Sequence, residues 1–442
     1  MHLGGKVTTL ALLCGLAGCM ETPAFMSKNG PESDANTGME DAEVARQTSS
    51  FTQPEGEQRS EVITTLLGRS SLLQSGSAYD KVARAALDAS ARSSEAELRS
   101  AKLRAVAMSK NWLPTLGPSI SLSSLGDLVA GILIEQVLFD NGRRKAEREF
   151  AAADVEVAAV NLAIDMNTRV ESAVALYVAG LRGDEKAALN QRALSRMSEF
   201  ERIVIGRVEG GISDRADRRV VEAKMNDIRS ALASAQEAAG AARAELRAMT
   251  GEGFDGGPSK LSMARPPQNA YHLSVMLAEA EAGRAVAQAK MDRAGLLPQL
   301  TASASVTNGG TTGGLNASSD QPFGFGTPAL LKAIEAARET ASRQVAEAEE
   351  EARRSYSRQE QRLASFNRQE AEAAELARSS RETFRLFQAQ FKAGQRTVMD
   401  VAAIYEQLVE REQAHIDAKY EVILIQLEMA RDLGLLADGE KI

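Results

Sequence analysis

Hydrophobic side chains recur at steps of three and four residues along the C-terminal stretch 397–433. Glu412 takes one position of this stripe, and the others are Val398, Val401, Tyr405, Leu408, Ile416, Tyr420, Ile423, Leu427, Ala430 and Leu433. The preceding stretch 329–390 has similar spacing with more alanine, which lets helices approach closely around a curve. This spacing is typical of helices packed as in a coiled coil. A simple bundle of helical hairpins would have the same periodicity.

Prolines leave two long tracts of the chain uninterrupted. The eleven prolines lie at positions 23, 31, 54, 114, 118, 258, 266, 267, 298, 322 and 328, so none falls within 119–257 or 329–442. Proline costs about 3 kcal/mol inside a helix, so these tracts permit very long helices. We expect helices at 143–205, 213–249, 329–390 and 397–433. A helix of about 64 residues would be on the order of 95 Å long.

A period of two residues marks the segments that precede the long helices. Within 299–307, threonine and serine alternate with alanine and valine, which predicts a strand with one wet and one apolar face. The stretches 116–124 and 128–139 predict a second strand pair, and the latter is apolar enough for lipid contact. We expect the glycine-rich stretch 308–320 to be a flexible loop that faces the exterior.

The chain repeats itself at an offset of 183 or 184 residues. Four landmarks keep this register: Leu113-Pro114 with Leu297-Pro298, Gly142 with Gly326, Gly211 and Asp217 with Gly394 and Asp400, and Gly251 with Gly434. An ordered set of this kind indicates a duplication.

The duplication predicts two equivalent units. Repeat 1 spans 61–251 and consists of a helical part with a loop near Gly76, a β-hairpin at 116–140 and a helical hairpin at 143–250. After a linker at 252–270, repeat 2 spans 271–434, with a helix, a β-hairpin at 299–325 and a helical hairpin at 329–433. A tail follows at 435–442. Because glycine commonly ends helices, we expect the hairpins to reverse at Gly210, Gly211 and Gly394.

The N-terminal segment predicts export and lipid anchoring. Lys6 and the apolar run 7–16 form a signal peptide, expected at 1–18, that is too short to span a bilayer. Leu16-Ala17-Gly18-Cys19 resembles a bacterial lipobox, so we expect a lipidated Cys19, with Met20 after it favouring the outer membrane. The alternative is an ordinary secretory signal with an incidental cysteine. Residues 19–60 predict an extended, lipid-anchored linker.

Composition argues against several function classes. The net charge of the chain is −8 and becomes −9 once Lys6 is removed, which argues against nucleic acid as a partner. Three histidines, one tryptophan and a single remaining cysteine offer little for catalysis or metal binding. No hydrolase, zinc-protease or P-loop motif occurs. We therefore expect no enzyme activity, no catalytic residues, no metal and no cofactor, and we expect His415 to be a packed or surface histidine.

Aromatic residues cluster where the predicted strands meet the helices: Trp112, Phe139, Phe323 and Phe325. Such residues favour the membrane–water interface, although core packing would also account for them. Four strands cannot close a barrel, and lipid tolerates no open sheet edge. Three copies would supply twelve strands, so closure predicts a trimer.

The chain resembles the TolC family of outer-membrane efflux proteins over nearly its whole mature length. The resemblance lies in Leu113-Pro114, in QVLFDNGRRKAE at 136–147, in 211–217 and 247–251, and most specifically in 391–436. It implies a mainly α fold with a small β part, in which a trimer forms a twelve-stranded β-barrel in the outer membrane and an α-helical barrel in the periplasm. It also implies a periplasmic adaptor protein and an inner-membrane pump or ABC exporter as partners, with adaptor docking at the helix tips.

The resemblance also implies a gate at those tips. Asp217 and Arg396 fall where opposite charges hold neighbouring hairpins together, and Asp400 falls where acidic side chains ring the constriction. Phe391 stands where the family's prototype has a tyrosine, so one hydroxyl hydrogen bond is absent here. Helix capping and compensation of the helix dipole are the alternative roles for the charged residues.

Two other classes of protein share some of these sequence features. A periplasmic adaptor is also a lipoprotein with a coiled-coil hairpin, but it would need lipoyl-like half-motifs around a single hairpin. A structural coiled-coil lipoprotein would not need the paired β segments. The cargo is not evident from the sequence, although LFDNG at 138–142 resembles type I secretion and general TolC members more than dedicated multidrug channels.

Overall fold

A computed structural model of the chain describes residues 60–90, 92–122, 128–257, 263, 270–307, 310–319 and 324–441. All of these belong to the compact unit Ser49–Ile442. The predicted signal peptide, Cys19, nearly all of the linker that follows it, and Phe323 lie outside the described residues.

The first half of the described chain has three short helices, a β-hairpin and two long helices. They are α2 (Glu61–Leu67), α3 (Ala78–Asp88), α4 (Ser93–Ser109), β1 (Thr115–Leu122), β2 (Leu128–Phe139), α5 (Arg143–Glu209) and α6 (Arg215–Thr250). α5 has 67 residues, which corresponds to about 100 Å. The expected helices at 143–205 and 213–249 are therefore present. α5 continues four residues beyond the predicted end, and α6 is shifted by one to two residues.

The second half repeats this order. It contains α7 (Leu273–Gly295), β3 (Gln299–Thr307), β4 (Gly310–Ser318), α8 (Thr327–Lys392), α9 (Val398–Asp432) and the 3-10 helix η1 (Gly439–Lys441). α8 begins 184 residues after α5 begins, and α9 begins 183 residues after α6 begins. α8 starts two residues earlier than expected, because Pro328 occupies the first turn, where its missing N–H is tolerated.

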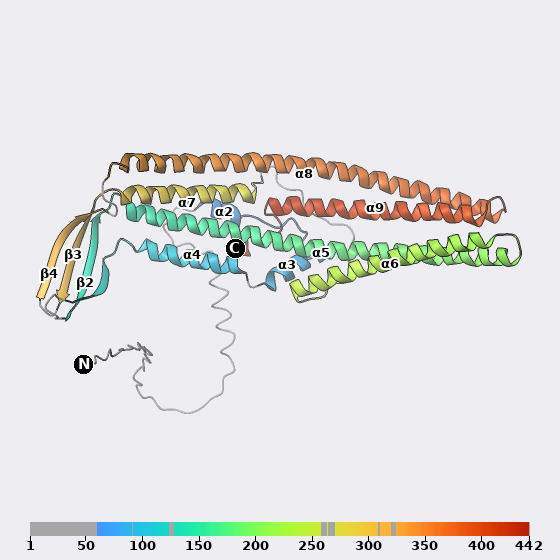
Figure 1. Ribbon diagram of the computed structural model, residues 1–442, viewed down its shortest axis with the longest axis horizontal. Coiled ribbons are helices and arrows are strands. Elements are labelled where there is room, and N and C mark those ends of the chain that lie inside the picture. Colours follow the sequence, from blue (N-terminus) through green and yellow to red (C-terminus); the bar gives the residue numbers. More distant parts are fainter. Residues whose placement is uncertain are drawn as a thin grey trace, which may run out of the picture. The chain divides into compact units, whose positions relative to one another are not determined.

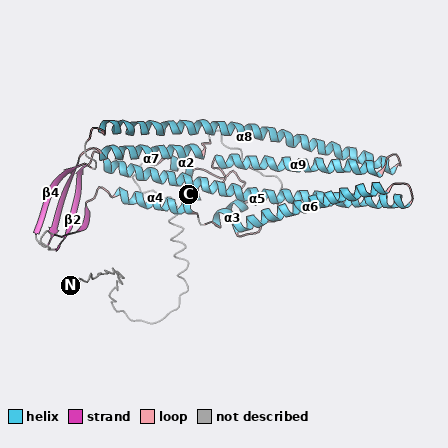
Figure 2. Ribbon diagram, in the orientation of Figure 1, coloured by secondary structure: helices cyan, strands magenta, loops and turns pink. Residues whose placement is uncertain are grey.

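The four strands form one antiparallel sheet in the order β1-β2-β3-β4 (Figure 2). The two hairpins are joined by pairing of β2 with β3, in which Ile132 lies opposite Val306. A Cβ on Gly131 would lie 2.4 Å from the carbonyl oxygen of Val306, so glycine is needed for this close approach. The prediction of a flexible loop at 308–320 is wrong for most of that range, because residues 310–318 form β4, which pairs with β3 from end to end.

The strand-to-helix junction of repeat 1 explains the Asp-Asn-Gly motif. Asn141 has φ of 53° and Gly142 has φ of 86°, which turns the chain sharply from β2 into α5. The Asp140 carboxylate accepts hydrogen bonds from the backbone N–H groups of Gly142 (3.1 Å) and Arg144 (2.8 Å), and so caps the start of α5. The Asn141 Nδ2 donates to the carbonyl of Pro298 (2.7 Å), which ties the junctions of the two repeats together.

The elements keep the same lateral order at three levels of the structure (Figure 1). Next to the sheet, the helices pack in the order α4-α5-α7-α8, and in the sheet the order is β1-β2-β3-β4. Toward the hairpin turns, the order is α6-α5-α9-α8. One side of the unit is therefore formed by α4, β1 and α6, and the other by β4 and α8.

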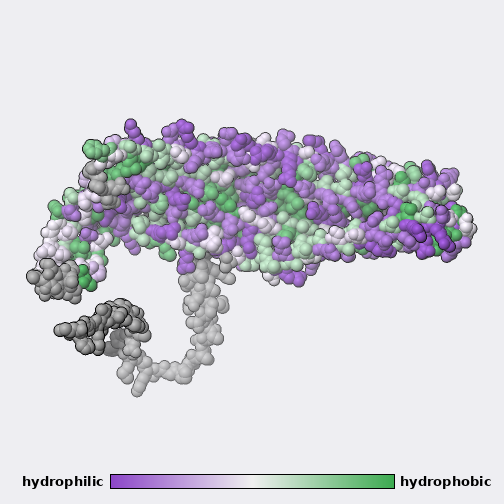
Figure 3. Space-filling view, viewed as in Figure 1, coloured by the Kyte–Doolittle hydropathy of each residue, from purple (hydrophilic) through white to green (hydrophobic). Residues whose placement is uncertain are grey.

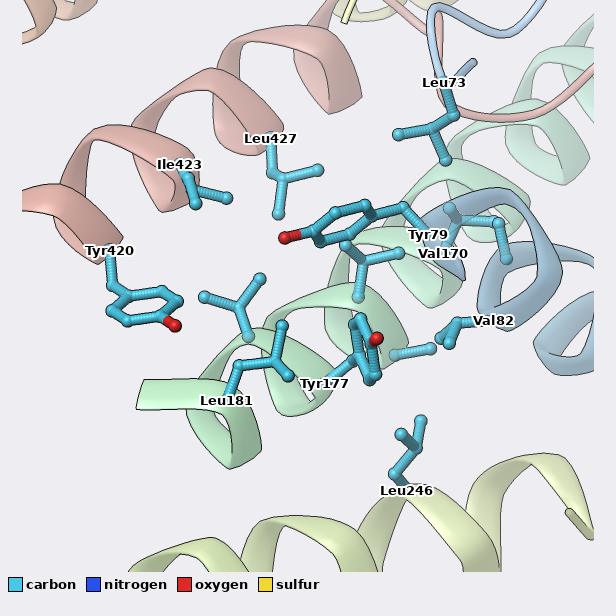
Figure 4. Packing of buried hydrophobic residues seen from close by; sticks show 14 of the residues in the cluster. Leu73, Tyr79, Val82, Val170, Tyr177, Leu181, Leu246, Tyr420, Ile423 and Leu427 are labelled. Atoms are coloured by element: carbon cyan, nitrogen blue, oxygen red, sulfur yellow. The ribbon is translucent and has the colours of Figure 1, made fainter. Parts of the chain in front are cut away.

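The core lies where α3, α5, α6 and α9 converge (Figure 4). Tyr79 and Tyr177 meet edge to face, with ring centroids 5.4 Å apart. Tyr420 is buried, and its hydroxyl donates to Glu185 Oε2 at 2.9 Å. Burial and this hydrogen bond raise the pKa of Tyr420. The apolar stripe predicted for 397–433 is buried here at Tyr420, Ile423 and Leu427.

The two ends of the described chain are bound to each other. Arg69 donates to the carbonyls of Leu433 (2.8 Å) and Tyr271 (2.7 Å), and burial lowers its pKa to about 10. The backbone N–H of Leu72 donates to the carbonyl of Leu435 at 2.8 Å. The tail after α9 is therefore part of the packed structure.

Among the described helices, none is both long and apolar enough to cross a membrane.

Candidate functional site

The sheet has one apolar and one polar face. On the apolar face, Leu116 lies opposite Ile134 and Pro118 opposite Ile132, and the face continues through Val306 and Leu315. Leu116, Ile120 and Leu315 are 70–73% exposed in this chain. Figure 3 shows apolar and near-neutral residues over the visible part of the sheet, whereas hydrophilic residues cover much of the helices. An exposed apolar face of this kind marks a contact with lipid or protein.

The opposite face is more polar, with small hydroxyl side chains on β3 and β4 beside Leu133 and Val137 of β2. Thr301, Ser303, Ser305 and Thr307 of β3 alternate with the residues of the apolar face, as predicted from the sequence. On β4, Thr312 lies opposite Ser305, and the two hydroxyls are 2.8 Å apart. This face suits contact with water.

Three of the four predicted interface aromatics lie among the described residues, and all three are exposed. Trp112 is 62% exposed and Phe139 is 60% exposed, and Phe325 is fully exposed. Core packing, the alternative role for these side chains, does not occur within this chain. All three lie next to the sheet, just before β1, at the end of β2 and just before α8.

The first hairpin turn joins α5 to α6. Gly210 ends α5 with a negative φ, and Gly211 follows with φ of 70°, a conformation that favours glycine. Asp214 caps α6, and Asp217 lies half-buried in its first turn. Ile212, which lies between Gly211 and Asp214, is 70% exposed. The turn therefore presents an apolar side chain and two carboxylates at the start of a helix.

The second hairpin turn joins α8 to α9. Gly394 has φ of 75° and reverses the chain. The exposed Arg396 donates to Gln390 Oε1 at 3.0 Å, and its guanidinium lies 4.6 Å from the centroid of the Phe387 ring. Phe391 is half-buried against the core. Within this chain, Arg396 thus contacts its own hairpin.

Asp400 takes part in a capping box at the start of α9. Its carboxylate accepts hydrogen bonds from the backbone N–H of Thr397 (3.0 Å) and from the Thr397 hydroxyl (2.8 Å), and Thr397 Oγ1 accepts from the Asp400 N–H (3.2 Å). The hydrogen bonds from Thr397 lower the pKa of Asp400, with a further contribution from Arg396. The capping role considered for Asp400 is thus present in the structure.

Ion pairs connect the two hairpins, and sequence reasoning missed all of them. Lys186 of α5 pairs with Asp417 of α9 at 2.7 Å, and Lys224 of α6 pairs with Glu406 of α9. Lys419 of α9 also pairs with Glu185 of α5. The partners are far apart in sequence, and charged residues are common on all these helices, so no local signal marks them.

The two histidines in the described part of the chain lie in packed surroundings. His272 meets Tyr356 edge to face with centroids 5.7 Å apart, and burial lowers its pKa. His415 Nε2 lies 3.2 Å from Glu370 Oε1, between α9 and α8. Across the described ranges, no His, Cys, Asp and Glu side chains gather into a group that could hold a metal ion.

Several solved structures of membrane proteins have the same fold. A membrane protein from Pseudomonas aeruginosa matches with a TM-score of 0.72 at 16% identity, over 88% of this chain and 97% of that chain. The open MtrE outer-membrane channel of Neisseria gonorrhoeae matches at 0.66 and 18% identity, over 88% and 98%. VceC, an outer-membrane protein of Vibrio cholerae, matches at 0.66 and 15% identity, over 80% and 96%. No protein-family model and no curated protein matches the sequence.

The fold of this chain is therefore that of an outer-membrane channel protein. More particularly, it is the TolC-type fold that the sequence resemblance implies, and the predicted class, mainly α with a small β part, is confirmed.

Proposed function

We propose that this chain is the subunit of an outer-membrane channel, a passive trimeric duct for efflux or type I secretion. The observation that carries this proposal is the sheet, which exposes an apolar face and has β1 and β4 as its two edge strands. Such an edge is stable in lipid only when another strand pairs with it.

The order of the elements supports closure by copies of the same chain. Because strand directions alternate from β1 to β4, β4 of one copy would run antiparallel to β1 of the next. The edges of the helical levels lie on the same two sides, with α4 and α6 on one and α8 on the other. Joining these sides builds a closed ring at every level. Three copies would supply twelve strands.

The burial of the long helices supports the same closure. α5 buries 25 of its 67 residues within the chain, whereas only five of the 66 residues of α8 are buried: Ala341, Ala352, Gln359, Ala377 and Phe384. α8 occupies the equivalent place in its repeat, so its additional exposed surface would be covered by α4 and α6 of the neighbouring copy.

The proposed location is the outer membrane of a Gram-negative cell, with the helices in the periplasm and a lipid on Cys19. The exposed Trp112, Phe139 and Phe325, with Phe323, would lie at the membrane interface. The hairpin turns at Gly210, Gly211 and Gly394 would dock a periplasmic adaptor that connects the duct to an inner-membrane pump or ABC exporter. The proposed outer-membrane location is supported by outer-membrane channels of similar fold.

The gate would lie at the same turns, with Asp217, Phe391, Arg396 and Asp400 near the opening. An adaptor that binds the open arrangement more tightly than the closed one would shift the equilibrium toward the open duct.

The test is conductance of the purified, detergent-solubilised protein in planar bilayers, together with its mass by light scattering. We expect a trimer with discrete conductance steps that become larger in Asp217→Ala and in Arg396→Ala. Arg196→Ala is the matched control, because Arg196 lies on the central helix α5, away from the turns, and pairs within that helix, with Glu199. A monomer without steps would contradict the channel and favour a structural or adaptor coiled-coil lipoprotein.

A further inference from the structure

The four described strands contain a single ionisable side chain, Glu135 of β2. The other polar residues of these strands are serine, threonine, asparagine and glutamine. The described strands contain no lysine or arginine, so no basic residue of the sheet balances the negative charge of Glu135.

The register places Glu135 on the polar face of the sheet. Its neighbour on β1 is Thr115, and its neighbour on β3 is Ser303. Ile134, the preceding residue of β2, belongs to the apolar face with Leu116. A charged side chain on a lipid-facing position destabilises a membrane-embedded sheet. In the proposed channel, the apolar side would therefore face lipid and Glu135 would face the water-filled interior.

Glu135 also has no cation paired with it among the described residues. It is exposed and makes no ion pair within the described residues, whereas Glu147, close to the start of α5, pairs with Arg143 at 3.2 Å. Its charge is therefore directed to the solvent of the interior.

We propose that Glu135 sets the ion preference of the membrane part of the duct. This inference rests on the proposed trimeric channel, in which three Glu135 carboxylates form a ring at one level of the barrel. Rings of acidic side chains attract cations and repel anions from a pore. Cationic solutes therefore pass this section more readily than anionic ones of the same size.

The ring is separate from the gate at the helix tips. Glu135 lies four residues before Phe139, so it is about 13 Å along β2 from the interface aromatics. The hairpin turns lie beyond the 67 residues of α5, on the order of 100 Å away. Because charges in solution are screened within about 10 Å at 0.1 M salt, the two charge groups act independently.

The experiment measures the reversal potential of single channels under a KCl gradient at low ionic strength. It is made in an Arg396→Ala background, so that the tips limit the current less. Relative to this background, Glu135→Gln is expected to reduce the cation-to-anion permeability ratio at least about twofold, and Glu135→Lys to reverse the preference. Glu135→Asp keeps the charge and the preference.

A relocated charge separates electrostatics from damage to the barrel. Ser303→Glu in the Glu135→Gln protein places a carboxylate on the same face, directly across from the lost one, and is expected to restore the permeability ratio. An unchanged ratio in Glu135→Gln and Glu135→Lys channels that still show steps overturns this inference alone. Absence of steps in the protein with native Glu135 overturns the proposed channel and this inference with it.

Discussion

Lys186 and Asp417 connect the two helical hairpins, with Lys186 Nζ 2.7 Å from Asp417 Oδ1 and 2.8 Å from Oδ2. Lys186 lies on α5 of the first repeat and Asp417 on α9 of the second. Gln413 lies one turn from Asp417, and its Nε2 donates to Asn190 Oδ1 at 2.8 Å, with Asn190 itself buried. A shift of one hairpin relative to the other would break both contacts.

Removing this ion pair is therefore expected to favour the open duct. In Lys186→Met, the aliphatic part of the side chain stays and the charge is lost. Both partners are partly exposed, so we expect a stability loss of only about 0.2–1 kcal/mol. Single-channel open probability in planar bilayers should rise, and the melting temperature should change little.

The matched control for this prediction is Arg196→Met. Arg196 lies on α5, as Lys186 does, and pairs with Glu199 one turn away at 2.7 Å, and this pair connects no other element. Its loss should leave the open probability unchanged. An equal rise in both variants, or in neither, would show that the Lys186–Asp417 pair has no part in gating.

Arg69 should contribute far more to stability than the surface arginines, because it binds the two ends of the described chain. Arg69→Met leaves the carbonyls of Leu433 and Tyr271 without this donor, at an expected cost of about 1–3 kcal/mol. Gly434→Ala should also destabilise, since φ is 65° there and a Cβ would lie 2.2 Å from Arg69 Nη1. Thermal unfolding followed by circular dichroism measures both, with Arg196→Met as the neutral reference. A reference variant that loses as much stability would contradict a special role for Arg69.

The long helices were predictable because their signals are local and repeated. Proline-free tracts and glycine reversals agree for α5, α6, α8 and α9, and apolar steps of three and four support them for α8 and α9. The strand that the sequence did not predict is β4, whose sequence GTTGGLNAS contains three glycines and one large apolar residue. Its strand form comes from pairing with β3, a tertiary contribution that outweighs a weak intrinsic preference.

The candidate site was predictable only at positions where the residue type fits a single structural role. Gly211 and Gly394 adopt the positive φ that turns require, so their places at the tips follow from the sequence. Asp400 has two uses, as a capping residue and as a charge near an opening, and the sequence does not separate them. The proposed role of Glu135 could not be predicted from the neighbouring sequence, because that role depends on which face of the sheet the residue occupies.

The capping role of Asp400 predicts a pH dependence at the second tip. Its folded-state pKa is lowered from 3.8, so its stabilising effect is present above that value and is lost as pH falls through the lower folded-state pKa. We expect faster hydrogen–deuterium exchange over 397–405 in Asp400→Ala than in the native chain at neutral pH. The ratio of the two exchange rates should begin to fall below about pH 4 and should approach one only below the lowered folded-state pKa.

A ratio that stays constant down to strongly acidic pH would mean that the ionised carboxylate does not stabilise this turn. Thr397→Ala gives an independent check, because it removes the other half of the capping box and should accelerate exchange over the same segment. Glu410→Ala lies outside the first turn of α9 and should leave exchange there unchanged.

Trp112 offers a direct test of the membrane boundary, since it is the only tryptophan of the chain. It is 62% exposed, one residue before Leu113-Pro114 and three before β1. At a membrane interface, its ring would contact the lipid headgroup region. We therefore expect its fluorescence in reconstituted vesicles to shift to shorter wavelength and to be quenched by lipids brominated near the headgroup more strongly than by lipids brominated at the chain ends.

Glu135→Gln should leave this depth profile unchanged, because the substitution lies on the interior face. Emission typical of water, with efficient quenching by aqueous iodide and none by brominated lipid, would place Trp112 outside the bilayer and remove the support that it gives to a membrane-embedded sheet.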